Sequence, residues 1–143
     1  MTMEQRIAKA RATGDTSDLV DIVPYYRFLG LTMRATPEGP VCLIPGGEKL
    51  VGNPALPALH GGVIGALLEA TAIMHLIWTR ESVSLPKIIN LTVEYLRSAR
   101  PVETAAAANV TKLGRRVANV RVEAWQDDRT KPVAYANALF LLT

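Results

Sequence analysis

The sequence has little of several residue types that mark specialised classes of protein. It contains a single cysteine, Cys42, so no disulfide can form within the chain and a disulfide-stapled mini-protein is excluded. Aromatic residues make up only 6% of the chain. With two histidines and no cluster of His, Cys, Asp and Glu at metal-ligand spacing, we expect no metal site. Because the first residues also lack the basic-then-apolar plan of a secretion signal, we expect a cytoplasmic protein.

The excess of charge of one sign is small. The chain has 16 Lys and Arg against 13 Asp and Glu, which gives a net charge of +3. A protein whose main partner is nucleic acid needs a clustered basic face, and this excess is too small to indicate one. It suits an anionic small molecule equally well.

Hydrophobic residues are abundant, at 49% of 143 residues, which favours one domain with a single core. The most apolar stretch is Leu59–Trp78, long enough to be tested as a membrane span. It contains His60, Glu69 and His75, and a carboxylate near the middle of a span costs about 2.5–3.5 kcal/mol. We therefore interpret this stretch as a helix buried in a soluble protein, with no membrane partner.

Periodicity and turn residues predict an α+β fold. We expect a curved antiparallel sheet of five or six strands wrapped around one long central helix, with a short helical segment at residues 1–28 preceding a domain at 29–143. The last four strands are predicted to form a meander. The predicted helices are 3–12, 18–26 (interrupted at Pro24) and 60–78, and the predicted strands are 29–35, 41–44, 88–97, 102–113, 115–126 and 132–142, with a loop over 45–57.

A helix that is apolar on every face must be covered on every face. One small sheet rarely encloses such a helix, so the sequence predicts that the chain forms a dimer. Gly61 and Gly65, one turn apart, predict close packing of the helix against a neighbouring element.

Glu69 lies among apolar residues on the central helix. Burial of an unpaired carboxylate is costly and raises its pKa unless a partner compensates. Two interpretations are open: an arginine such as Arg97 or Arg121 holds Glu69 in a structural ion pair, or Glu69 is a catalytic base or nucleophile in an interface cleft.

The triplet His60-Gly61-Gly62 stands at the start of the same helix. First-turn N–H groups lack helical partners and the helix dipole is positive there, so the position suits an oxyanion or a polarised carbonyl. The glycines let a ligand approach the backbone closely. His60 has an equally ordinary interpretation as a capping residue bonded to the loop. Gly61 and Glu69 are eight residues apart, about 12 Å along a helix, too far to act on one reacting carbon unless they come from different chains.

The combination resembles a known family. Asn53-Pro54, His60-Gly61-Gly62 and the acid in Leu67-Leu68-Glu69 are similar to the hotdog-fold acyl-CoA thioesterases of the phenylacetate-degradation (PaaI-like) type, within the 4-hydroxybenzoyl-CoA thioesterase superfamily. Tyr95-Leu96-Arg97 followed by Ser98-Ala99 resembles that family's Tyr-Leu-Arg-Pro-Ala strand end, and Gly114-Arg115-Arg116 resembles its Gly-Arg hairpin. The resemblance covers about two thirds of the chain.

The resemblance implies hydrolysis of aryl- or medium-chain acyl-CoA by a homodimer, often paired into a homotetramer, with active sites at the dimer interface. The backbone N–H of Gly61, helped by the Asn53 side chain, would polarise the thioester carbonyl. Glu69 of the facing protomer would attack it or activate a water. His60 would hold the geometry of the site.

The resemblance also implies where the substrate binds. Gly62 and the hairpin residues Gly114, Arg115 and Arg116 would contact acyl-CoA, the two arginines near its nucleotide phosphates. Coenzyme A enters as part of the substrate, and no separate cofactor is expected.

The sequence departs from the family pattern at two positions. Many members carry Ser or Thr one turn after the acid or near the start of the next strand, where this chain has Ile73 and Ile88. Away from the motif, we predict that His75 is a core or interface histidine and that Cys42 is a buried, inert thiol. The competing functions are a hotdog enoyl-thioester hydratase or dehydratase and a non-catalytic acyl-CoA-binding module.

Overall fold

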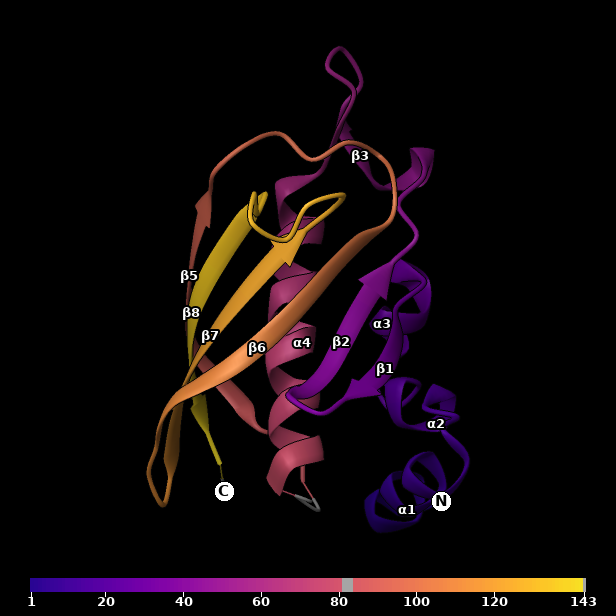
Figure 1. The fold of residues 1–143 in the computed structure, drawn as a ribbon, viewed down its shortest axis with the longest axis vertical. Helices are drawn as coiled ribbons and strands as arrows, with labels where there is room; N and C mark the ends of the chain where they lie inside the picture. Colours follow the sequence, from indigo (N-terminus) through magenta and orange to yellow (C-terminus); the bar gives the residue numbers. More distant parts are fainter. Residues whose placement is uncertain (81–83, 143) are drawn as a thin grey trace.

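The computed structural model describes residues 1–80 and 84–142, and Figure 1 shows their arrangement. In chain order the elements are α1 (Met3–Thr13), α2 (Ser17–Val20), α3 (Pro24–Leu29), β1 (Thr32–Thr36), β2 (Gly39–Ile44), the 3-10 helix η1 (Glu48–Leu50), β3 (Val51–Asn53), β4 (Ala58–Leu59), α4 (Gly61–Arg80), β5 (Lys87–Tyr95), β6 (Thr104–Leu113), β7 (Val117–Trp125) and β8 (Ala134–Leu141).

The main sheet has six strands in the order β1-β2-β6-β7-β8-β5, and every neighbouring pair is antiparallel. Only β6, β7 and β8 form the meander that we predicted from the last four strands. Strand β5 pairs with β8 at the edge of the sheet. The prediction that β5 and β6 lie side by side is therefore wrong. The reason is that residues 96–103 cross over the end of the sheet and deliver the chain to β6 beside β2 (Figure 1).

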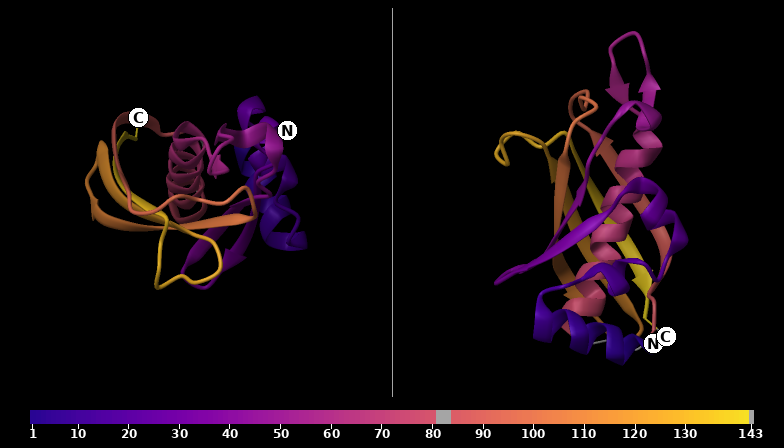
Figure 2. Two further views of the ribbon diagram at one scale, coloured as in Figure 1. Left: turned by 90° about the horizontal axis from the view of Figure 1, so that it is seen from above. Right: turned by 90° about the vertical axis from the view of Figure 1, so that its right-hand side faces the viewer.

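Helix α4 lies on the concave face of this sheet, as the view from above shows (Figure 2). The inward residues of β7 alternate as predicted: Ala118, Val120, Val122 and Ala124 are all buried. Side chains of α4 pack on them with Leu67, Leu68, Met74 and Leu76 fully buried. A single long helix held in a curved antiparallel sheet is the hotdog architecture predicted from the sequence.

Among the helices of residues 1–80 and 84–142, α4 alone is long and apolar enough to cross a membrane. However, 67% of its apolar 18-residue window is buried inside the fold. Burial against the sheet gives a sufficient reason for the apolar composition, in agreement with the interpretation of a core helix.

The N-terminal helices pack against the same core as the sheet. Thr2 and Gln5 form a reciprocal capping box at the start of α1, and the Arg11 guanidinium lies 4.4 Å from the ring centroid of Trp78 near the end of α4. Helix α3 runs to Leu29 and ends where Gly30 adopts a positive φ of 71°. The strand predicted from residue 29 therefore begins at Thr32, and the predicted boundary between residues 28 and 29 falls inside α3.

The predicted loop over 45–57 contains more regular structure than expected. After η1, the short strands β3 and β4 pair with each other and form a hairpin that projects beyond the sheet at the N-terminal end of α4 (Figure 1). The chain turns from this hairpin directly into the helix.

Candidate active site

His60 connects the hairpin to helix α4 and is fixed by its backbone. Its N–H donates to the Leu50 carbonyl at 2.8 Å, and its carbonyl accepts from the N–H groups of Val63 and Ile64 at 2.9 and 3.3 Å. Its ring turns back on the helix, where Nδ1 accepts the Gly62 N–H at 2.8 Å. His60 is thus the cap that the ordinary interpretation predicted, and the same bonds hold the first turn of α4 in place.

Gly61 retains a free backbone donor at the start of the helix. The N–H groups of Gly62, Val63 and Ile64 all have acceptors, whereas no acceptor in residues 1–80 or 84–142 takes the Gly61 N–H. Its carbonyl accepts the Tyr95 hydroxyl at 2.7 Å. One unpaired N–H at the positive end of a 20-residue helix is a donor aimed at a partially negative ligand atom.

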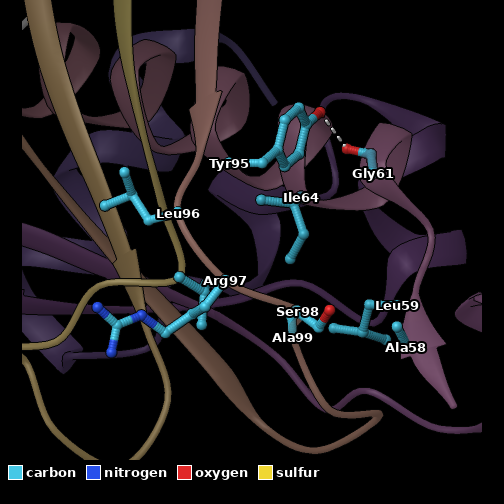
Figure 3. A pocket seen from close by; sticks show the side chains of 10 residues that line it. Ala58, Leu59, Gly61, Ile64, Tyr95, Leu96, Arg97, Ser98 and Ala99 are labelled. Carbon is cyan, nitrogen blue, oxygen red and sulfur yellow. Dashed lines mark hydrogen bonds between the residues drawn. The ribbon is translucent and has the colours of Figure 1, made fainter. Parts of the chain in front are cut away.

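A pocket of 370 Å³ opens beside Gly61. Figure 3 shows Tyr95 over Gly61 on one side of it, with Ile64, Leu59 and Ala99 forming apolar walls. The guanidinium of Arg97 is turned away from Gly61. The lining therefore combines apolar walls with a few polar groups, as small-molecule pockets commonly do.

Glu69 lies two turns further along α4 and is half-buried. Burial raises the pKa of its carboxyl group. Within the described part of the chain, no hydrogen bond or ion pair reaches this carboxylate. Of the two arginines considered as partners, Arg121 places its guanidinium 4.3 Å from the ring centroid of Tyr135, and Arg97 lines the pocket. Within the described residues of one protomer, the ion pair that one interpretation expected for Glu69 is therefore not formed.

The residues of α4 that remain partly open to solvent form one stripe on its N-terminal half. They are Gly61, Gly62, Gly65, Ala66 and Glu69, whereas the intervening positions Val63, Ile64, Leu67 and Leu68 are buried. The stripe borders the edge strand β5, whose Tyr95 approaches Gly61 and Gly65. Gly61 and Glu69 stand about 12 Å apart along it, at 1.5 Å per residue.

Asn53 lies in the projecting hairpin and is exposed. Its side-chain oxygen accepts the Ala55 N–H at 3.0 Å and stabilises the turn between β3 and β4. The donor of this side chain is its Nδ2 amide. Asn53 is not among the residues that line the pocket beside Gly61.

Gly114, Arg115 and Arg116 form the exposed turn between β6 and β7. The Gly114 N–H donates to the Val117 carbonyl at 2.9 Å, and the Arg116 carbonyl accepts from Leu142 at 2.7 Å near the C-terminus. This turn lies at the end of the molecule opposite the start of α4 (Figure 1). A single protomer therefore does not bring the two arginines together with Gly61.

The remaining residues discussed from the sequence lie in the core or on the edge strand. Cys42 is fully buried, which raises the pKa of its thiol to about 12, so the prediction of an inert thiol is confirmed. His75 is 7% exposed and contacts β2 at Gly39, in agreement with a core histidine. Ile73 is buried, and Ile88 is partly exposed on the edge strand.

Two residues of the site were missed as site residues from the sequence. Tyr95 was noted only as part of a strand-end motif, yet it holds the first carbonyl of α4. Gly52 was counted as a loop glycine, yet a Cβ at this position would lie 2.7 Å from the His60 Cα, so only glycine lets β3 pass behind His60. The available signals were the tyrosine ending the strand after the helix and the glycine next to Asn53.

Comparison with known proteins identifies the family. The model of the thioesterase superfamily matches residues 56–133, which include the triplet at His60, Glu69 and the Gly114 turn. The chain is 28% identical to the medium/long-chain acyl-CoA thioesterase YigI of Salmonella typhimurium, over 84% of this chain and 86% of that protein. YigI of Escherichia coli K12 matches at the same identity and coverage.

Comparison with solved structures gives the same fold. A crystal structure of a protein from Chromobacterium violaceum is 43% identical, covers 97% of both chains and superposes with a TM-score of 0.77. A phenylacetic acid degradation-related protein from Ralstonia eutropha JMP134 is 26% identical over 82% of this chain and 89% of that chain, with a TM-score of 0.73. The chain therefore belongs to the thioesterase superfamily, as the residues around His60 and Glu69 predicted, and is a hydrolase of thioester bonds.

Proposed function

We propose that this protein hydrolyses aryl- or medium-chain acyl-CoA to the free acid and coenzyme A. The observation that carries the proposal is a pair of unsatisfied groups on one open helix face: the free Gly61 N–H and the unpaired Glu69 carboxylate. The names of the matched relatives, medium/long-chain acyl-CoA thioesterases, support coenzyme A as the leaving group.

The two groups supply what hydrolysis of a thioester needs. A thioester is already activated, so the enzyme must stabilise negative charge on the carbonyl oxygen and position an attacking group. The Gly61 N–H binds that oxygen, and Glu69 either attacks the carbonyl carbon or takes a proton from an attacking water. If Glu69 takes a proton from water, a C–O bond forms to that water, the C–S bond breaks, and the proton passes to the sulfur, which leaves as the thiol of coenzyme A. If Glu69 attacks, the C–S bond breaks to release the thiolate and leaves an acyl–Glu69 anhydride; water then hydrolyses the anhydride to the free acid and regenerates the carboxylate, and a proton released from that water is taken up by the thiolate.

The complete site in this proposal is built by two protomers. Gly61 and Glu69 of one helix are about 12 Å apart, so one thioester carbon reaches both only if they belong to facing chains. Strand β5 is an unpaired edge of the sheet with Ile89 53% and Ile88 38% exposed, which is the kind of edge that a second copy covers. The partly exposed positions Gly65 and Glu69 on α4 would be covered by the same second copy.

The dimer also gives the basic turn a place in substrate binding. A two-fold copy that pairs antiparallel along β5 is turned end for end, so its β6–β7 turn lies at the same end as the Gly61 of the first protomer. Arg115 and Arg116 of the copy would then meet the phosphates of coenzyme A, while Gly62 lies against the substrate near the thioester. Asn53 would contribute its Nδ2 amide from the hairpin beside Gly61.

The proposed reaction uses no metal and no cofactor apart from the coenzyme A of the substrate. Because Cys42 is buried as a thiol, the protein suits the reducing cytoplasm, where acyl-CoA is found.

Release of free coenzyme A thiol tests this function. The panel runs from acetyl-CoA to palmitoyl-CoA and includes phenylacetyl-CoA and benzoyl-CoA. We expect turnover on medium-chain or aryl substrates. Tight binding of these esters without thiol release would instead indicate an acyl-CoA-binding module, and water addition to an enoyl-CoA would indicate a hydratase.

Substitution of Glu69 by glutamine tests the role of the carboxylate. Glu69→Gln keeps the size of the side chain and removes its charge, so we expect kcat to fall by about 10²–10⁴-fold while the substrate still binds. The matched control is Glu103→Gln, which changes an exposed glutamate on the crossover segment and should leave kcat as it is. Undiminished hydrolysis by Glu69→Gln would overturn the assignment of this residue.

A further inference from the structure

Tyr95 ends the edge strand β5 and lies on the first turn of α4 (Figure 3). Its hydroxyl donates to the Gly61 carbonyl at 2.7 Å. A Cβ at Gly61 would lie 3.4 Å from the tyrosine ring, and one at Gly65 would lie 3.8 Å from the hydroxyl oxygen. The ring thus packs on the face of the helix where both glycines stand, at ordinary van der Waals distances that a Cβ would also allow, so the close packing predicted for Gly61 and Gly65 is not required by this contact.

The peptide group that accepts the hydrogen bond from Tyr95 makes a second hydrogen bond through its own N–H. The Gly61 carbonyl and the Gly62 N–H belong to the same peptide, and the Gly62 N–H donates to Nδ1 of His60 at 2.8 Å. Tyr95, this peptide and the His60 ring therefore form a chain of two hydrogen bonds in one direction. Each bond polarises the next, because a carbonyl that accepts a hydrogen bond makes its own N–H a stronger donor.

This chain fixes the state of the His60 ring. A nitrogen that accepts a hydrogen bond carries no proton, so Nδ1 is bare and the ring proton lies on Nε2. In this tautomer the ring presents an N–H donor on its far side. His60 is also held at its backbone by Leu50, Val63 and Ile64, so neither the ring nor the peptide that carries the Gly61 N–H is free to turn.

We propose that Tyr95 is a positioning residue of the thioesterase: its hydroxyl fixes the first peptide of α4 and, through that peptide, the His60 ring and the direction of the free Gly61 N–H. This inference rests on the proposed function, because it assigns Gly61 as the donor to the thioester carbonyl. Tyr95 acts through the backbone and does not itself touch the reacting atoms. The anchor lies on β5, so it ties the donor to the strand that forms the edge of the sheet.

The test compares Tyr95→Phe with Tyr95→Ala and with a matched control, Tyr135→Phe. Tyr95→Phe keeps the ring against the helix and removes only the hydroxyl. Tyr135 in β8 also donates its hydroxyl, at 2.5 Å to the Glu94 carboxylate on β5, so this control removes a tyrosine hydrogen bond between two strands that does not involve Gly61. For Tyr95→Phe we expect kcat to fall about three- to tenfold, the range that one neutral hydrogen bond contributes, with KM unchanged. Tyr135→Phe should keep the kcat of the parent.

A second readout does not depend on turnover. In NMR spectra of labelled protein, Tyr95→Phe should shift the Gly62 amide proton and the His60 ring nitrogens, and Tyr135→Phe should leave both in place. If the parent hydrolyses no thioester while these shifts occur, the proposed function fails and the hydrogen-bonded chain stands.

Three results would overturn the role of Tyr95. The first is an unchanged kcat in Tyr95→Phe together with a loss in Tyr95→Ala, because the ring alone would then be needed. The second is an equal fall of kcat in Tyr135→Phe. The third is failure of Tyr95→Phe to fold, because a local anchor is not required for the core to form.

Discussion

The Glu69 side chain has opposite effects on activity and stability because of where it lies. It is half-buried on an apolar helix, and no described residue compensates its charge. Burial favours the protonated carboxyl and so raises its pKa. The titratable group that senses its charge is Tyr26 of α3, whose pKa is raised by burial first and by Glu69 second, so Tyr26 stays neutral near pH 7.

The pH dependence of hydrolysis should show this raised pKa. The proposed base or nucleophile works only when ionised, so kcat/KM should rise with pH through a midpoint above 4.5, the ordinary value for glutamate. The measurement is a pH profile of kcat/KM between pH 4 and pH 8 at constant ionic strength. A midpoint at or below 4.5 would contradict the burial of the carboxylate.

The same shift predicts how stability responds. The folded state holds its proton more tightly than the unfolded state, so the stabilising contribution is present below pH 4.5 and is lost as pH rises through the folded pKa. The Glu69→Gln side chain does not ionise, so the variant does not lose this contribution to stability as the pH rises. Thermal unfolding should therefore occur at a higher temperature in Glu69→Gln than in the parent at pH 7, with a smaller difference at pH 4. Glu103→Gln, on the exposed crossover, should show no such trend.

At this scale the sequence indicated the two candidate residues Glu69 and Gly61, but it did not indicate the residues that contact them. Glu69 was found because a carboxylate in an apolar run is costly, and Gly61 was found because a helix start is a donor site. The ring of Tyr95 reaches Gly61 from a strand 34 residues later, and no local pattern predicts that contact. Gly52 and His60 likewise meet only because β3 and β4 pair.

Two glycines with positive φ lie at the ends of individual elements, and they differ in what surrounds them. Gly39 begins β2 with a φ of +115°, and a Cβ there would lie 2.7 Å from the ring of the buried His75 on α4. Gly47 has a similar φ of +102° before η1, but no atom lies within 4 Å of the position its Cβ would take. Comparison of the two glycines separates backbone strain from a clash between elements.

We expect Gly39→Ala to destabilise the protein more than Gly47→Ala. The positive φ costs about 1–3 kcal/mol for a residue with a side chain, and both variants carry this cost. Only Gly39→Ala must also displace the His75 ring and with it the contact of α4 with β2. Urea unfolding of both variants measures the difference. Equal losses of free energy would show that the His75 contact adds nothing to the strain.

The types of the elements followed from periodicity, and their order in the sheet did not. Alternation along β7 and the apolar run of α4 placed both within a few residues of their observed bounds, because burial on one face dictates residue choice. Chain order alone favoured β5 beside β6. The crossover of residues 96–103 places β5 beside β8 instead, and the polar residues of that segment do not specify where it docks.

At the scale of the whole molecule, one protomer holds parts of a site that do not meet. The free Gly61 N–H and Glu69 lie about 12 Å apart on α4, and the Arg115 turn lies at the other end of the fold (Figure 1). The exposed face of α4 and the bare edge of β5 are the surfaces that a second copy would cover. Each protomer would then supply the donor of one site and the carboxylate of the other.

Hybrid dimers made from two inactive variants test this arrangement. Gly61→Pro removes the N–H, and proline is well tolerated at the first position of a helix, where its Cβ would make only a 3.4 Å contact with the Tyr95 ring. Each parent, Gly61→Pro or Glu69→Gln, should be nearly inactive. In a hybrid isolated through two different tags, one site combines an intact Gly61 with an intact Glu69 from the other chain, so activity should return to about half that of the parent dimer. If donor and carboxylate worked within one chain, every site of the hybrid would carry one defect and no activity would return.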